Sequence, residues 1–299
     1  MFGMRSMAFV LLARRTRASM RVLALASCVG WIIVACNLGL DVDALEKGCP
    51  DCVDGSVTDA RDDRDASVIQ EADAPDASID AAEAGRCPSK HGPTMVFAIE
   101  SCMDTTEVTN AQYAEFVAAN MRFDTAPCDG TTPYAPTVNG AANEPVRGVP
   151  FCAARAFCAW AGKRLCGRRN AAGTGGALEP ALLGRPDLDE WTATCSNNGA
   201  NDYPYGKAFD GKACNGDDFG TRVPLTVGSL AGCVAANDGP RDLSGNVWEW
   251  IDCCEADGGF CFAHGGAFNS PQPELTCASR LRLARETGLD TVGFRCCSR

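Results

Sequence analysis

The carboxylates that could bind a ligand lie near the carboxyl end of the chain, in the segment DLSGNVWEW, residues 242–250. Successive side chains of a strand point to opposite faces, so a strand over 247–251 would put Trp248 and Trp250 on one face and Glu249 on the other. A glutamate opposite a buried aromatic pair either lies on the surface or binds something. Because hard cations such as calcium prefer oxygen ligands, the segment is a candidate cation site.

Sulfur is the second source of chemistry, because the chain has 19 cysteines and only two histidines. So many cysteines are unusual in a cytosolic protein and typical of disulfides formed in an oxidising compartment. A zinc site is the competing interpretation. Only the segment CPDC, Cys49–Cys52, has the spacing of zinc ligands, and no second pair accompanies it. We therefore expect disulfides and an exported protein.

The first residues have the features of an export signal. Val22–Ala35 is apolar and is followed by Cys36, a pattern that resembles a bacterial lipoprotein signal in which this cysteine is lipidated. Residues 1–36 are thus expected to be a signal peptide with a lipobox, which anchors the protein to a membrane. Met20 is an alternative start, and Cys28 is an alternative lipidation site. A spanning helix is the competing structure, although these apolar residues fall short of the ~20 that it needs.

Residues 37–86 are expected to be an acidic, disordered linker. The part from 41 to 86 holds 14 acids against four Lys or Arg, which accounts for most of the formal charge of −11 of the whole chain. This segment has no aromatic residue and no helical or strand periodicity, so it cannot bury enough apolar surface to offset the entropy of ordering. No basic stripe follows Arg21, and nucleic acid is therefore not an expected partner.

Residues 87–299 have the composition of a folded domain that is long enough for a hydrophobic core. Helices are expected over 109–120, where Thr109 and Gln112 have capping-box spacing, over 151–162 and over 186–195. Short strands are expected in VPLTVGSL (223–230), VWEWIDCC (247–254), GGAF (265–268) and VGFRCC (292–297). Few helices, many loops and many cysteines predict an irregular, disulfide-stapled α+β domain.

Eight segments between residues 100 and 297 form a recognisable series. They are TTEVTNAQYAEFV, PVRGVPFCAARAFCAWAGKRL, EWTATC, YPYG, VGSL, DLSGNVWEW, GGAF and VGFRC. In this order they resemble the formylglycine-generating enzyme family, also called sulfatase-modifying factors. The resemblance implies a loop-rich, C-type-lectin-like fold and an oxygen-dependent enzyme that converts a protein cysteine to formylglycine.

The resemblance also implies structural calcium at DLSGNVWEW. Position by position, the ligands correspond to the side chains of Asp242 and Glu249 and to the backbone carbonyls of Gly245 and Val247. A second calcium site would begin at Asn215, in a loop that is shortened here. The alternative for Glu249 is a surface position.

The residues of the family's catalytic cleft match only in part. Trp248 corresponds to an aromatic residue that lines the cleft, although a tryptophan also fits the core. The active enzymes have Arg-Gly-Gly-Ser followed by two cysteines, whose thiolates bind copper(I), a soft ion. Here His264, Ala267 and Ser270 replace the arginine, the serine and the first cysteine, and only Cys277 matches, after an insertion of two residues. Cys277 is thus either a free catalytic thiol or half of a disulfide.

One disulfide is implied directly, because Cys158 and Cys296 correspond to two family cysteines that bridge one another. Cys195 corresponds to a cysteine of a second family bridge, but the partner position holds Arg282 here. We therefore expect Cys195 to pair elsewhere, with Cys214 as the nearest choice.

Residues 87–299 contain 15 cysteines, which is an odd number. At least one of them is therefore unpaired or pairs outside the domain, with Cys49 or Cys52. Cys253 or Cys254 is expected to join Cys261.

Two functions remain open. The first is an envelope-anchored, catalytically divergent family member that serves as a binding or structural module for a protein, peptide or glycan. The second is a copper-dependent oxidoreductase that makes formylglycine. Ser270 favours the first, because one thiolate is a poor copper(I) site and a hydroxyl does not replace the other. Whether the chain is an enzyme, and which partner it binds, is left open by the sequence.

Overall fold

The computed structural model describes residues 87–123, 128, 134–136, 140–169 and 175–299. The expected signal peptide, Cys36 and the acidic linker lie outside these residues. The described residues belong to one compact unit, Gln70–Arg299. Within them, every helix is too short or too polar to cross a membrane.

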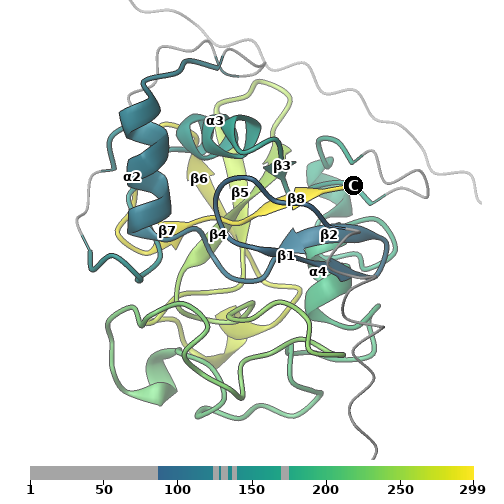
Figure 1. The fold of residues 1–299 in the computed structure, drawn as a ribbon. Coiled ribbons are helices and arrows are strands. Elements are labelled where there is room, and N and C mark those ends of the chain that lie inside the picture. Colours follow the sequence, from purple (N-terminus) through teal and green to yellow (C-terminus); the bar gives the residue numbers. More distant parts are fainter. Residues whose placement is uncertain (1–86, 124–127, 129–133, 137–139, 170–174) are drawn as a thin grey trace, which may run out of the picture. The chain divides into compact units, whose positions relative to one another are not determined.

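Two sheets organise the described part of the domain (Figure 1). The first contains, in spatial order, β1 (Met95–Ala98), β2 (Ser101–Asp104), β8 (Cys296–Ser298) and β3 (Arg164–Leu165), all paired antiparallel. The second contains β6 (Arg280–Ala284), β5 (Phe260–His264), β4 (Trp248–Cys254) and β7 (Val292–Gly293), and only β4 and β7 are parallel. The helices are α2 (Asn110–Ala119), α3 (Phe151–Trp160) and α4 (Glu190–Cys195), with 3-10 turns η2 (Pro180–Leu182), η3 (Asp217–Phe219) and η4 (Gln272–Leu275).

The capping box of the first expected helix is present in α2. The side chain of Thr109 accepts a hydrogen bond from the backbone of Gln112, whose side chain in turn accepts one from the backbone of Thr109. Tyr113 and Phe116 are buried, and the Tyr113 ring stacks on Phe157 of α3 at 5.7 Å. These aromatic contacts hold α2 beside α3, as Figure 1 shows.

Helix α3 forms where the sequence is nearly continuous in apolar residues, and the chain leaves it through Gly162 at φ +74°. Its Cys158 is bonded to Cys296 of β8, with an S–S distance of 2.05 Å. This is the pair that the family resemblance implies. Closing a loop of 138 residues stabilises the fold by about 5 kcal/mol in the chain-entropy description.

Seven disulfides connect described residues: Cys87–Cys102, Cys128–Cys152, Cys158–Cys296, Cys166–Cys297, Cys195–Cys277, Cys214–Cys233 and Cys254–Cys261. Cys261 was expected to pair with Cys253 or Cys254, and it pairs with Cys254. The expected pairing of Cys195 with Cys214 is wrong, because α4 directs Cys195 into a buried cluster that also holds Cys277. The odd cysteine among the described residues is Cys253, which is free and buried. So many bridges are typical of a protein that folds in an oxidising environment.

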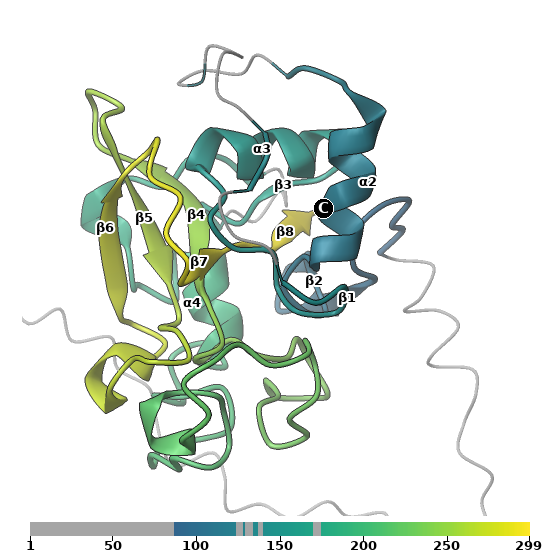
Figure 2. The same ribbon diagram turned by 90° about the vertical axis from the view of Figure 1, so that its left-hand side faces the viewer.

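Two expected strands are loops. Residues 223–230 are partly exposed and do not pair with a strand, and their VPLTVGSL segment turns at Gly228, φ +68°. Strand β5 ends at His264, and residues 265–268 continue as a loop. The strand cannot extend further because Gly265 and Gly266 take φ values of +98° and +79°, which no extended strand contains. Figure 2 shows that the chain between α4 and β4 also forms loops, with η3 as its regular turn.

Candidate functional site: a buried charge cluster and a closed cysteine pair

Strand β4 separates its side chains as the alternation predicts. Trp248 and Trp250 are 5% and 0% exposed and belong to the main hydrophobic cluster. Glu249 points to the other face, but it is only 1% exposed, so the surface interpretation of this residue is wrong. Trp248 is accordingly a core residue in this structure.

Glu249 is the counter-ion of Arg295, the arginine of the VGFRC segment. Arg295 Nη2 lies 2.6 Å from Glu249 Oε1, and Arg295 Nε lies 2.7 Å from Oε2. Trp191 of α4 donates a third hydrogen bond from Nε1 to Oε2 at 2.7 Å. Burial opposes the charge of Arg295, but the negative charges of Glu249, Glu107 and Asp242 together outweigh burial and raise the pKa of the guanidinium.

The residues that the resemblance implies as calcium ligands are therefore not all available to bind an ion. Glu249 does not fit, because a guanidinium that donates to both of its oxygens would repel a second cation at that position. The amide of the Asn215 side chain is also engaged at both ends, through Val223, Asn246 and Thr221.

Asp242, Gly245 and Val247 lie in the turn that leads into β4. Asp242 takes φ +61° and accepts a hydrogen bond from the backbone of Gly228. Gly245 takes φ +76°, and a Cβ there would meet the backbone oxygen of Asn215 at 2.3 Å, so this position requires glycine. Val247 is fully buried.

Glu107, which sequence reasoning did not single out, faces the same cluster from the loop between β2 and α2. It is 0% exposed, and its Oε1 accepts a hydrogen bond from Asn246 Nδ2 at 2.9 Å. Its Oε2 has no donor among the described residues. Burial first, and then the charge of Asp242, raise the pKa of Glu107 well above its ordinary value. The sequence signal that could have found Glu107 is its place in TTEVTN, the start of the first segment that resembles the family.

The residues expected in the catalytic cleft form a closed turn. Ser270 is 2% exposed, and its Oγ donates to Glu274 Oε2 at 2.7 Å and accepts from the backbone of Ala267 at 3.1 Å. Ala267 is completely buried. These contacts give Ser270 a structural role at the entrance to η4.

Cys277 is bonded to Cys195, with an S–S distance of 2.03 Å, so the free-thiol interpretation of Cys277 is wrong. Cys253 is the free cysteine among the described residues, and burial raises the pKa of its thiol to about 12. A thiol with that pKa is a poor source of thiolate at neutral pH. The two thiolates that copper(I) needs are thus not available among the described residues in this oxidation state.

His264, at the position of the family's arginine, is held as a cation. Its Nε2 lies 2.9 Å from Asp189 Oδ2, and its Nδ1 lies 2.6 Å from the carbonyl oxygen of Ser279. Both partners are acceptors, so both ring nitrogens must donate. Burial lowers the pKa of this histidine, but Asp189 and Ser279 more than compensate and raise it above 6.5.

A cavity of about 350 Å³ lies beside the Cys195–Cys277 bridge. Its polar lining comes from α4, from the loop that follows α4 and from the segment around Cys277: Thr192, Ser196, Asn201, Asp202 and Thr276. The cavity can therefore offer hydroxyl, amide and carboxylate groups to a ligand, but no thiolate.

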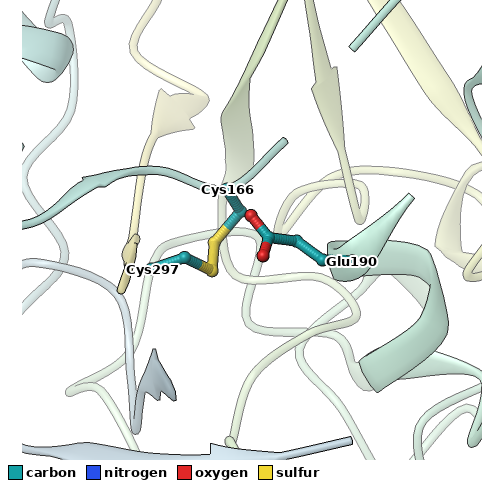
Figure 3. Close-up of side chains that lie close together, drawn as sticks. All are labelled: Cys166, Glu190 and Cys297. Atoms are coloured by element: carbon teal, nitrogen blue, oxygen red, sulfur yellow. A yellow bond between two sulfur atoms is a disulfide. The ribbon is translucent and has the colours of Figure 1, made fainter. Parts of the chain in front are cut away.

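Cys166, Glu190 and Cys297 also lie close together (Figure 3), with ligand atoms within 4.8 Å of one another. The two sulfurs form a disulfide, which is a poor metal ligand. Glu190 is paired with Arg164 and accepts a hydrogen bond from the backbone of Gly167 at 2.6 Å. These three side chains thus stabilise the buried interior of the domain, and we do not interpret them as a metal site.

Comparison with known proteins places the domain. No curated protein sequence matches the chain. Many solved structures are similar at low identity, and three of them can be named. They are PvdO from Pseudomonas aeruginosa (19% identity, 70% of this chain and 84% of that chain, TM-score 0.48), Treponema denticola variable protein 1 (14%, 71% and 92%, TM-score 0.45) and CarF (17%, 71% and 96%, TM-score 0.42). Residues 78–299 match the family model of the sulfatase-modifying factor enzyme 1-like domain, and the chain therefore belongs to that family.

Proposed function

We propose that this chain is a catalytically divergent member of its family, exported and anchored to the cell envelope, that binds a protein or peptide. The observation that carries the proposal is the Cys195–Cys277 disulfide. This bond engages Cys277, which corresponds to one of the two cysteines that bind copper(I) in the active enzymes. Ser270, at the other cysteine position, is a hard donor whose hydroxyl is already bonded to Glu274.

The competing function is a copper-dependent oxidoreductase that converts a protein cysteine to formylglycine. It would require the reduction of Cys195–Cys277 and a second thiolate from elsewhere. Cys253 is a poor candidate, because it is 0% exposed and its pKa is about 12. The residues present therefore do not fit copper(I), and we assign the protein no step that uses this ion.

The decisive experiment is an assay on the purified protein. It is incubated with oxygen, copper and a peptide that bears the sulfatase motif Cys-x-Pro-x-Arg, and the product is weighed by mass spectrometry. We expect no aldehyde above the background of copper alone, both before and after mild reduction. Aldehyde formation that depends on the protein would overturn the proposal, and loss of that activity in Cys277→Ser would assign the reaction to this cysteine.

Binding is expected at the cavity beside the bridge. Peptides selected from a random library on the parent protein should bind Ala278→Trp at least ~10-fold more weakly, since a bulky ring at this exposed wall position fills the cavity. Ala256→Trp, at an exposed position in a separate cavity, is the matched control and should bind normally. If both variants bind like the parent, the ligand surface lies elsewhere.

A further inference from the structure

The cavity beside the Cys195–Cys277 bridge has one charged residue in its lining among the described residues, and that residue is Asp202. Asp202 is exposed, and its carboxylate has no hydrogen bond or ion pair with any other residue that the structure describes. Its backbone oxygen accepts a hydrogen bond from the backbone of Cys277 at 2.8 Å, which holds the residue at the cavity wall. The cavity therefore presents a negative charge that the described part of the domain leaves without a counter-ion.

Other charged groups near the cavity are already paired. Arg185, which precedes a lining residue, lies 2.7 Å from the carboxylate of Asp187. Asp189, the N-cap of α4, lies 2.9 Å from Nε2 of His264. Neither pair offers a cation to Asp202, so a positive group that enters the cavity meets this carboxylate without a competitor.

The buried hydroxyl groups of the lining have already used their protons. Thr192 and Ser196 are 2% and 4% exposed. Oγ1 of Thr192 donates to Asp189 Oδ2 at 2.8 Å, and Oγ of Ser196 donates to the backbone oxygen of Thr192 at 2.6 Å. Because a hydroxyl has a single proton, each of these oxygens can only accept a hydrogen bond from a ligand. The cavity thus favours a ligand group that donates hydrogen bonds.

The wall of the cavity also has an apolar part, which includes Pro186, Ala278 and the bonded sulfur of Cys277. A ligand that fits both parts has an aliphatic stem and an end group that is positive and donates. Lysine and arginine side chains have this composition. An acidic side chain would be repelled by Asp202, and a purely apolar one would leave the buried acceptors without a partner.

We propose that this cavity binds a lysine or arginine side chain of a peptide, with Asp202 as the counter-ion of its cationic end. The inference rests on the proposed function, which places peptide binding at the cavity. It adds the class of side chain that the cavity selects and the residue that sets the preference.

The test uses the full-length protein and four capped pentapeptides, Gly-Ser-X-Ser-Gly, in which X is lysine, arginine, norleucine or glutamate. Norleucine keeps the aliphatic stem of lysine without its charge. In an NMR titration at low ionic strength, the lysine and arginine peptides should bind about 5-fold more tightly than the norleucine peptide, as expected for one exposed ion pair. The glutamate peptide should bind most weakly, and added salt should reduce the preference.

Two variants assign the preference to one carboxylate. Asp202→Asn should abolish the preference for the basic peptides and leave the affinity of the norleucine peptide unchanged. Asp238→Asn removes an exposed carboxylate that does not line this cavity. It is the matched control and should keep the preference.

The contrary outcomes separate this inference from the proposed function. Four peptides that bind the parent equally, and Ala278→Trp more weakly, would overturn the inference and leave peptide binding at the cavity in place. A basic preference that survives Asp202→Asn would also overturn the inference, because the attraction would then come from the acidic protein as a whole. If the basic peptides do not bind the parent, the inference is wrong even where library-selected peptides bind. If Ala278→Trp weakens no peptide, both the inference and the proposed place of binding are wrong.

Discussion

The carboxylate of Glu249 and the guanidinium of Arg295 form a bidentate ion pair at 2.6 and 2.7 Å, across 46 residues of sequence. Both side chains are completely enclosed, and the pair joins β4 to the segment that leads into β8. A buried pair of this kind specifies which surfaces meet, because each charge is costly without the other.

Removing the cation of this pair should be severe. Arg295→Met should lower the free energy of unfolding by about 3–5 kcal/mol, because it leaves the Glu249 charge buried without a partner. Denaturant unfolding at pH 7 measures the loss. The double variant Glu249→Gln with Arg295→Met should regain part of it, and additive losses would show that the two groups are not energetically coupled.

The Cys195–Cys277 bridge closes a loop of 82 residues. Replacing both cysteines by serine should cost up to about 4–5 kcal/mol in the chain-entropy description. Thermal unfolding measures the loss, and Cys253→Ala, which breaks no bridge, is the control with a smaller expected effect. Peptide mapping without reduction should recover the two cysteines in one linked peptide. Finding them alkylated instead would contradict the assigned bridge.

Stability should depend on pH through His264 and Asp189. The pKa of His264 is raised above its ordinary value of 6.5, so its contribution is complete below pH 6.5 and is lost as pH rises through the folded-state pKa. The pKa of Asp189 is lowered from 3.8, so its contribution is present above pH 3.8 and is lost in stronger acid. Unfolding measured from pH 5 to 9 should show a fall at the alkaline end. His264→Gln should be less stable at pH 5 and lack that fall, whereas an unchanged profile would mean that the ring does not titrate in the folded state.

Membrane attachment should depend on Cys36. Expression of Cys36→Ala in a bacterial host, followed by fractionation, should move the protein out of the membrane fraction, because the residue that would carry the lipid is gone. Cys28→Ala is the matched control and should stay with the membrane. If Cys36→Ala remains as membrane-bound as the parent, a spanning segment is the better explanation.

The sequence by itself determined the local features of this protein. The capping box at Thr109 involves residues three positions apart, and the alternation around Trp248, Glu249 and Trp250 is a property of any strand. The ordered motifs identified the family, and the cysteine content identified an oxidising environment. The capping box and the strand alternation can be predicted from the sequence because the residues involved are neighbours along the chain.

The tertiary structure decided the partners. Glu249 faced away from the tryptophans as expected, but only the path of the chain brought Arg295 to it. Cys195 could reach several cysteines by sequence distance, and the direction of α4 selected Cys277. Glu107 stands in a segment of the family resemblance, but only the fold buries its carboxyl group near the buried Asp242. Side chains far apart in sequence meet only where packed helices and sheets bring them together, so charge pairs and disulfides do not follow from spacing alone.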